Sequence, residues 1–234
     1  MSDHSEPESD PNDPWIGRTL ASYTLIRKIG GGGMGVVYLA QHHSLDRRAA
    51  VKFLPAELAS NAGYVEMFLR EANAAAKLNH TNIVGVYDAG HLGENIYYFI
   101  MEYVEAHDLR ILLEEKGTIP VPEAVQYIRQ AASALGYAHK KKIIHLDIKP
   151  ENMLLTPEGI IKVADLGLAK WIGTESSMMT QSGETLGSPL YMSPERLKDP
   201  EHIDARTDIY SLGGTFYEMI TGQAPYQGTA AVVM

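Results

Sequence analysis

The hydrophobic pattern along the chain changes its period after the first few segments. Several short apolar runs rich in β-branched and aromatic residues come early, separated by glycine or polar turns, and such runs predict β-strands. Between the third and fourth runs, from Val65 to Ala76, apolar residues recur at spacings of three and four, which predicts an amphipathic helix. The predicted strands are 23–29, 36–40, 49–54, 83–87 and 97–103.

The second half of the sequence is mostly helical in pattern. One helix is predicted to begin at Pro122 and Glu123, because proline's fixed φ and an acidic residue near the positive end of the helix dipole both favour a helix start. It runs to the basic residues 140–142. The residues that line one face of this helix are Val125, Ile128, Ala132, Leu135 and His139.

Two further elements follow this helix. Apolar runs at 153–155 and 160–163 flank a Thr-Pro-Glu-Gly turn, which predicts a short hairpin. A last helix is predicted over Ala205–Thr221, ended by Gly222.

Composition narrows the class of protein. The 234 residues are 45% hydrophobic and 21% charged, as expected for a globular protein with a sizeable core. The net charge of −9 argues against nucleic acid as a partner, because such proteins usually concentrate positive charge. Cysteine is absent, which excludes disulfides and thiolate sites and fits the cytoplasmic location that we expect.

The ends and the histidines carry weaker signals. Residues 1–14 are acidic and rich in Ser, Pro and Asp, which predicts a disordered leader rather than a signal peptide. No run approaches ~18 apolar residues, so no membrane span is predicted. The nine histidines show no HExxH pattern, so a histidine-based metal site is not expected.

Residues 30–35 read Gly-Gly-Gly-Gly-Met-Gly and contain the pattern GxGxxG. In a dinucleotide-binding fold a helix would follow directly, but here the next residues predict a strand. The glycines therefore join two strands, as in a phosphate-binding hairpin in which the missing Cβ lets backbone amides approach phosphate oxygens. From this motif alone, a flexible hairpin tip is the alternative.

Lys52 lies within an apolar run, where a lysine costs free energy unless it is paired. Glu71 lies one position from the apolar stripe of the following helix and can reach back to the sheet. An ion pair between them would place the lysine for contact with the α- and β-phosphates of a nucleotide. Two separate surface charges are the alternative, but the strand-then-helix order and the glycine hairpin favour the pair.

Residues 145–152 read His-Leu-Asp-Ile-Lys-Pro-Glu-Asn and hold the most specific pattern of the chain. Phosphoryl transfer needs an acid that orients the attacking hydroxyl, a cation near the moving phosphoryl group and oxygen ligands for Mg²⁺. Asp147, Lys149 and Asn152 match these needs in turn. Asp165, after the predicted hairpin, offers a second oxygen ligand. For any one of these residues alone, a solvated polar loop is the alternative.

These motifs occur in the order seen in protein kinases, which the chain resembles from Tyr23 to its end. The resemblance implies an α+β, two-lobed fold within a domain at 15–234. A small antiparallel-sheet lobe with one key helix would span about 20–103, and a mostly helical large lobe about 104–234. The motifs are Gly30/Gly32/Gly35/Val37, Lys52, Glu71, Asp147/Asn152, Asp165-Leu166-Gly167 and Ser193-Pro194-Glu195.

The subtype also follows from the resemblance. Lys-Pro-Glu-Asn at 149–152 is similar to the segment of serine/threonine kinases, and 187–195 is similar to the bacterial form of the substrate-facing loop. The resemblance implies transfer of the γ-phosphate of ATP to Ser or Thr hydroxyls of proteins, with Mg²⁺ or Mn²⁺. It further implies that Ser188 contacts Asp147 and Lys149, and that the small lobe can form a homodimer. Asp208 resembles a buried aspartate that anchors the catalytic segment.

The resemblance also assigns roles residue by residue. The implied catalytic residues are Asp147, Lys149, Lys52 and Glu71, and the implied metal ligands are Asn152 and Asp165. Met101 resembles the residue at the back of the adenine pocket, and Glu102 and Val104 would offer backbone groups to the adenine. The implied nucleotide-binding residues are Ile29, Gly30, Gly31, Gly32, Gly33, Met34, Gly35, Val37, Ala50, Lys52, Met101, Glu102, Val104 and Leu154.

Three departures from the family pattern stand out. Leu146 replaces the arginine of His-Arg-Asp, which normally pairs with a phosphate on the activation loop, so ordering by phosphorylation comes into question. Phosphate is nevertheless predicted at Thr180 or Ser182, with ordinary polar loop residues as the equal alternative. Leu166 replaces the phenylalanine of Asp-Phe-Gly but keeps an apolar side chain.

The third departure is that the sequence stops at Met234, where the resemblance implies further helices. We therefore expect an incomplete large lobe and a Glu195 that lacks its arginine partner. A kinase-like fragment with impaired catalysis that binds nucleotide or a partner is the alternative to an active kinase. The retained Lys52, Asp147 and Asp165 favour the active enzyme.

Overall fold

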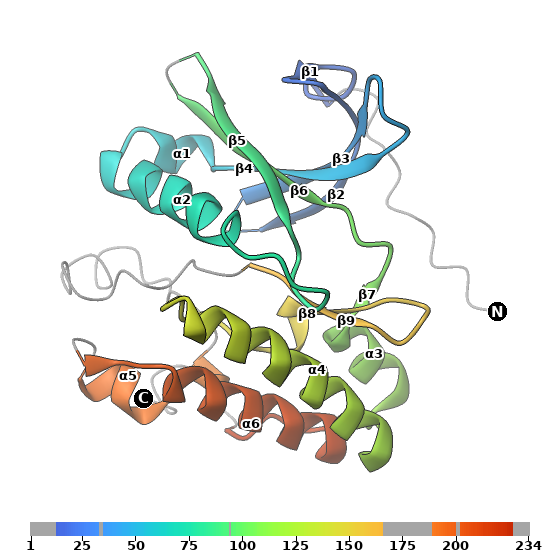
Figure 1. Cartoon of the computed structure of the whole chain (residues 1–234), viewed down its shortest axis with the longest axis vertical. Helices are drawn as coiled ribbons and strands as arrows, with labels where there is room; N and C mark the ends of the chain where they lie inside the picture. The colour runs from blue at the N-terminus through green and yellow to red at the C-terminus, as the bar shows by residue number, and fades with distance from the viewer. Residues whose placement is uncertain (1–12, 33–34, 94, 166–188, 200–201, 227–234) are drawn as a thin grey trace. The chain divides into compact units, whose positions relative to one another are not determined.

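The computed structural model describes residues 13–32, 35–93, 95–165, 189–199 and 202–226, which form two compact units (Figure 1). The first unit holds the described residues up to 76 together with 85–103. The second unit holds 77–84 and the described residues from 104 onward. The first combines a sheet with two helices, and the second is mainly helical, as the α+β prediction requires.

The first unit is built on a six-stranded antiparallel sheet. Its strands lie in the order β1-β2-β3-β4-β6-β5, and the helices follow β4 in the chain. The strands are β1 (Thr19–Leu20), β2 (Tyr23–Gly32), β3 (Gly35–His42), β4 (Arg48–Phe53), β5 (Val86–Leu92) and β6 (Ile96–Glu102), and the helices are α1 (Ala56–Ala59) and α2 (Ala62–Ala75).

The two faces of this sheet carry separate hydrophobic cores, because successive side chains of a strand point to opposite faces. On one face α2 packs against the strands (Figure 1), and the rings of Phe68 and Phe99 lie 5.0 Å apart. On the other face Trp15 covers Phe53 at a ring distance of 4.7 Å. The segment before β1 therefore completes the second core.

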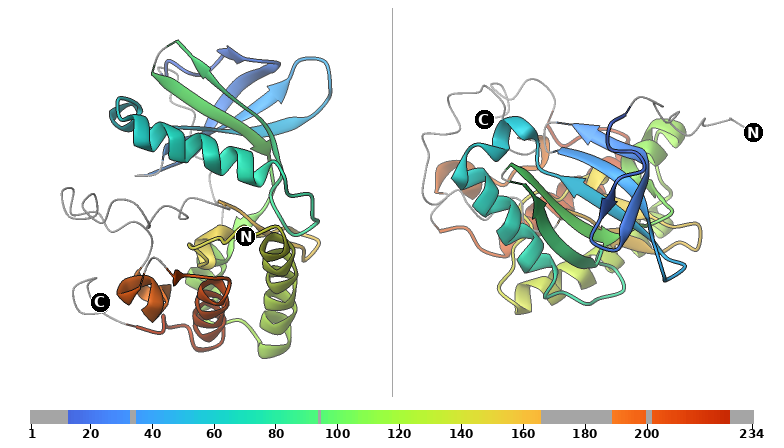
Figure 2. Two further views of the ribbon diagram at one scale, coloured as in Figure 1. Left: turned by 60° about the vertical axis from the view of Figure 1, so that its left-hand side comes forward. Right: turned by 90° about the horizontal axis from the view of Figure 1, so that it is seen from above.

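The second unit contains a small three-stranded sheet and four α-helices among its described residues. Helices α4 and α6 pack side by side (Figure 2). The strands, in sheet order, are β7 (His107–Asp108), β8 (Met153–Leu155) and β9 (Ile161–Val163). The helices are α3 (Leu109–Lys116), α4 (Val121–Lys140), α5 (Pro194–Lys198) and α6 (Arg206–Thr221), with 3-10 turns η1 (Pro150–Asn152) and η2 (Pro189–Tyr191).

Local chemistry sets the ends of these helices. The carboxylate of Asp108 accepts a hydrogen bond from the N–H of Ile111 (3.0 Å) and caps α3. Gly222 ends α6 with φ +74°, and a Cβ there would lie 2.6 Å from the carbonyl oxygen of Gly117, which ends α3. Glycine is thus required where the two helix ends meet.

Most of the elements predicted from the sequence are confirmed, and two expectations need correction. The strand predicted at 83–87 begins only at Val86, because Ile83 and Val84 pair with Val163 in the second unit. The predicted face of α4 is only partly its buried face, because Leu135 is buried but Val125 is 47% exposed. The buried face is made mainly of alanines, which let neighbouring elements approach closely.

Within the described ranges, no helix combines the length and the hydropathy that a membrane crossing requires.

Candidate active site

The catalytic segment 145–152 is anchored by a buried carboxylate from α6. Asp208 accepts hydrogen bonds from the backbone N–H groups of His145 (2.9 Å) and Leu146 (2.8 Å). Leu146 has φ +67°, a left-handed conformation that costs free energy for a branched residue. The two bonds stabilise this turn, and the anchoring role predicted for Asp208 is confirmed.

The ionised form of Asp208 is favoured by its surroundings. Burial alone raises the pKa of this carboxyl group. The hydrogen bond to Nε2 of His139 (2.7 Å), the nearby His145 ring and the two backbone N–H groups outweigh burial and hold the pKa below its ordinary value. The anchor therefore keeps its negative charge at neutral pH.

His145 connects the catalytic segment to the end of β9. Its Nε2 lies 2.9 Å from the carbonyl oxygen of Ala164, and its Nδ1 accepts from the N–H of Asp147 (3.2 Å). This pair of partners requires a proton on Nε2. The N–H of Ala164 also donates to the carbonyl oxygen of Asn152 (3.0 Å). Asp165, the next residue, is thereby tied to both ends of the segment.

Three predicted site residues meet at one carboxylate oxygen. Oδ2 of Asp147 lies 3.0 Å from Nζ of Lys149 and accepts a hydrogen bond of 3.0 Å from Nδ2 of Asn152. The same Nδ2 donates to the backbone carbonyl of Asp147 (2.7 Å). The 3-10 turn η1 brings Asn152 back to Asp147, and both residues are buried. The orientation of the Asp147 carboxylate is therefore fixed.

The available oxygen ligands suit a cation that arrives with phosphates. The two side-chain hydrogen bonds of Asn152 use its amide nitrogen, so its amide oxygen faces elsewhere, and Asp165 adds a carboxylate. Among the described residues, no group of three or more His, Asp or Glu side chains is placed to hold a metal. Mg²⁺ is commonly held by one or two protein oxygens together with substrate phosphates, so this pair fits such an ion.

The glycine hairpin belongs to the first unit and joins β2 to β3, as predicted. Gly30 pairs with Val37, and Gly32 pairs with Gly35. Gly35 has φ +120°, and a Cβ there would lie 2.1 Å from the carbonyl oxygen of Phe53. Only glycine fits at this position.

Lys52 lies on β4, next to the residue that contacts Gly35. It is 4% exposed, and its Nζ lies 5.8 Å from the centre of the Phe99 ring on the paired strand. Ala50 of the same strand pairs with Met101 of β6. The N–H of Glu102 donates to the carbonyl oxygen of Gly85 (2.8 Å).

The predicted site residues thus fall into two sets, one in each unit. The described members in the first unit are Ile29, Gly30, Gly31, Gly32, Gly35, Val37, Ala50, Lys52, Met101 and Glu102, and those in the second are Val104, Asp147, Lys149, Asn152, Leu154 and Asp165. Gly33, Met34, Leu166, Gly167, Thr180, Ser182, Gly187 and Ser188 lie outside the described residues, as does the side chain of Glu71.

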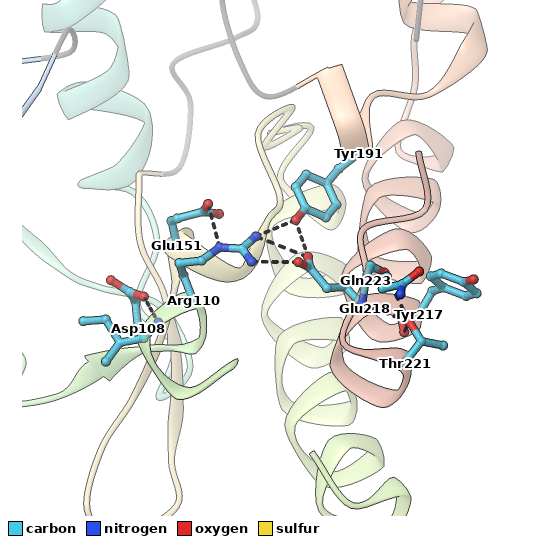
Figure 3. Close-up of polar contacts among 9 residues, drawn as sticks. Asp108, Arg110, Glu151, Tyr191, Tyr217, Glu218, Thr221 and Gln223 are labelled. Carbon is cyan, nitrogen blue, oxygen red and sulfur yellow. Dashed lines mark hydrogen bonds and ion pairs between the residues drawn. The ribbon is translucent and has the colours of Figure 1, made fainter. Parts of the chain in front are cut away.

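The sequence interpretation missed a charged cluster around Arg110 (Figure 3). The guanidinium of Arg110 lies between Glu151 on one side and Tyr191 and Glu218 on the other. It donates to Glu151 (3.1 Å), Tyr191 (2.7 Å) and Glu218 (2.7 Å), and the Tyr191 hydroxyl donates to Glu218. The cluster, here called the Arg110 cluster, joins α3, η1, η2 and α6. Its members are far apart in sequence, so no local spacing reveals it.

The charges in the Arg110 cluster stabilise one another. Burial alone lowers the pKa of Arg110, but the hydrogen bond to Glu218 and the surrounding negative charges raise it above its usual range. Burial and the bond to Glu218 raise the pKa of the Tyr191 hydroxyl. At neutral pH Arg110 is therefore a cation and Tyr191 a neutral phenol.

Glu195 has a hydrogen-bond partner on α6, and the expectation that it lacks its usual arginine stays a prediction. Its Oε1 accepts a hydrogen bond from the hydroxyl of Thr207 at 3.1 Å. Thr207 also lies 3.3 Å from the hydroxyl of Ser193. Both ends of the Ser193–Glu195 motif are therefore tied to the first turn of α6.

Comparison with known proteins places this geometry in a family. A protein kinase domain model matches residues 23–233. The crystal structure of the PknI kinase domain from Mycobacterium tuberculosis superposes with a TM-score of 0.74 at 30% identity, covering 90% of this chain and 79% of that one. The chain belongs to the protein kinase family.

Its relatives are bacterial serine/threonine kinases. A probable serine/threonine-protein kinase from Clostridium perfringens is 42% identical over 220 residues, which are 94% of this chain and 32% of the relative. The serine/threonine-protein kinase PrkC of Bacillus subtilis is 40% identical over 218 residues, or 93% of this chain and 33% of the relative. The chain thus spans about a third of the length of these relatives.

Proposed function

We propose that this chain transfers the γ-phosphate of ATP to serine or threonine hydroxyls of protein substrates, with Mg²⁺. The observation that carries the proposal is the contact of both Lys149 and Asn152 with one oxygen of Asp147. That arrangement leaves the second oxygen of Asp147 to accept the proton of an attacking hydroxyl. Membership of the protein kinase family and the names of the relatives support it.

The roles of the catalytic segment follow from its contacts. Asp147 orients the substrate hydroxyl and accepts its proton. Lys149 lies 3.0 Å from Asp147, so its ammonium group can neutralise charge on the phosphoryl group as it moves. The amide oxygen of Asn152 and the carboxylate of Asp165 would hold Mg²⁺, which would supply positive charge at the phosphate oxygens.

The first unit contributes the nucleotide contacts in this proposal. The glycine hairpin approaches the phosphates with its backbone amides, and Lys52, paired with Glu71, contacts the α- and β-phosphates. Within this unit, Ala50 and Met101 contact the adenine. The roles of the other nucleotide-binding residues named from the resemblance stay predictions.

The non-catalytic alternative receives no specific support. A chain that only binds nucleotide does not need Asp147, Lys149 and Asn152 in mutual contact, and all three have kept that geometry. A cytoplasmic location and dimerisation through the small lobe stay predictions.

The test is phosphate transfer from γ-labelled ATP with Mg²⁺ to a peptide library that contains serine, threonine and tyrosine acceptors. The proposal predicts phosphoserine and phosphothreonine products, with no phosphotyrosine, and at least a 10²-fold loss in Asp165→Asn, because a charged metal ligand is removed. The matched control Asp46→Asn, at an exposed turn, keeps full activity. Equal incorporation by the wild type and Asp165→Asn would contradict the proposal.

A further inference from the structure

Arg196 is a buried arginine that reaches the centre of the catalytic segment. It lies on α5, directly after the Ser193–Glu195 motif, and is only 5% exposed. Arginine is seldom buried to this degree unless its charge is compensated. Its Nη1 donates to the backbone carbonyl oxygen of Leu146, the residue immediately before Asp147.

Leu146 is therefore held by side chains at both of its backbone polar groups. Its N–H donates to Asp208 of α6 (2.8 Å), and its carbonyl accepts from Arg196 of α5. The backbone at Leu146 is in the left-handed region, with φ +67°. A small rotation of the peptide between Leu146 and Asp147 would turn the Asp147 carboxylate, because that peptide leads directly to its Cα.

The local charges agree with this placement. Burial lowers the pKa of Arg196, while the negative charges of Asp147 and Asp208 act in the opposite sense. Both carboxylates are thus within electrostatic reach of the guanidinium. An arginine keeps its proton at any physiological pH, so it supplies a permanent cation beside an otherwise apolar Leu146.

We propose that Arg196 is a positioning residue for Asp147, and that it couples the placement of α5 to the catalytic geometry. This inference rests on the proposed kinase function for its activity readout. The link consists of protein groups only, so the orientation of Asp147 by α5 requires no phosphate on the chain. In this proposal the cation beside Leu146 comes from α5, not from the catalytic segment itself.

The activity test compares Arg196→Met and Arg196→Lys with the control Lys198→Met, an exposed cation on the same helix. Arg196→Met should lower kcat on the order of 10²-fold, as expected when a catalytic group is misplaced, and leave KM for ATP within about twofold. Arg196→Lys keeps the charge and should recover part of kcat. A change in KM alone, or equal effects of Arg196→Met and Lys198→Met, would overturn the proposal.

Amide hydrogen exchange gives a readout that does not depend on activity. Arg196→Met should accelerate exchange of the Leu146 and Asp147 amides at least tenfold, with the amides of Thr215 and Met219 in α6 unchanged. Unchanged exchange at 146 and 147 would refute the coupling even in an active enzyme. If the wild type transferred no phosphate, the kinase proposal would fail while exchange still decided the role of Arg196.

Discussion

Replacing Arg110 by methionine tests how the second unit holds its catalytic segment. Arg110 donates to Glu218, Glu151 and Tyr191, and methionine keeps most of the aliphatic volume while removing every donor. Glu218 is then left with the neutral Tyr191 hydroxyl as its donor within the Arg110 cluster. The variant therefore leaves a buried carboxylate without its counter-charge.

The expected loss of stability is about 2–3 kcal/mol. Removing one partner of a fully buried ion pair costs roughly 3–5 kcal/mol. The side chain of Glu218 is 6% exposed, but Arg110 is 26% exposed, so the upper end of that range does not apply. Glu151 is 40% exposed, so its pair adds at most about 0.5 kcal/mol.

Urea unfolding of the chain measures this loss. At an m-value of about 2–3 kcal/mol/M, Arg110→Met should lower the midpoint by about 1 M. The control Arg129→Met, at an exposed site on α4, should change stability by less than about 0.5 kcal/mol.

A double-mutant cycle with Glu218→Gln isolates the pair. The two substitutions should be non-additive by about 1–2 kcal/mol, since the second removes the charge that the first leaves unpaired. Additive effects, or an Arg110→Met no worse than Arg129→Met, would show that the Arg110 cluster contributes nothing specific.

Two further predictions concern the anchor and the glycine hairpin. Because the pKa of Asp208 is lowered in the folded state, its contribution to stability is present above the unfolded pKa of about 3.9 and is lost as pH falls through the folded pKa. The stability difference between wild type and Asp208→Asn, measured by urea titration, should therefore shrink below about pH 4. A difference that does not change with pH would contradict this. Gly35→Ala should lower the free energy of unfolding by roughly 2–4 kcal/mol, because its Cβ would collide with the Phe53 carbonyl at a positive φ. The control Gly136→Ala in α4, where a Cβ would meet nothing within 4 Å, should be neutral or slightly stabilising. Thermal melts of both variants measure the difference.

Local signals predicted the elements well where side-chain period and turn chemistry agreed. Gly222 marked the end of α6 because its left-handed φ is a local requirement. The apolar run around Lys52 predicted β4, and the spacing of apolar residues predicted α2 within a few residues. The prediction of a strand starting at Ile83 was wrong, because Ile83 pairs with Val163, which is 80 positions away in the sequence.

The candidate site divides in the same way. Asp147, Lys149 and Asn152 are close in sequence, so their spacing predicted their contact. The contacts of Arg110 and Arg196 depend on elements that meet only in the folded unit, and neither residue has a neighbour in sequence that signals its role. Buried charges of this kind are visible only once tertiary packing is known.

The most direct test of the account is single-turnover phosphate transfer from γ-labelled ATP to a serine peptide by wild type and Asp147→Asn. Asparagine preserves the shape of the side chain but cannot accept the hydroxyl proton, so the rate should fall by about 10²–10⁴-fold with little change in ATP affinity. Transfer by Asp147→Asn at the wild-type rate would show that Asp147 does not perform the role on which the proposed function depends.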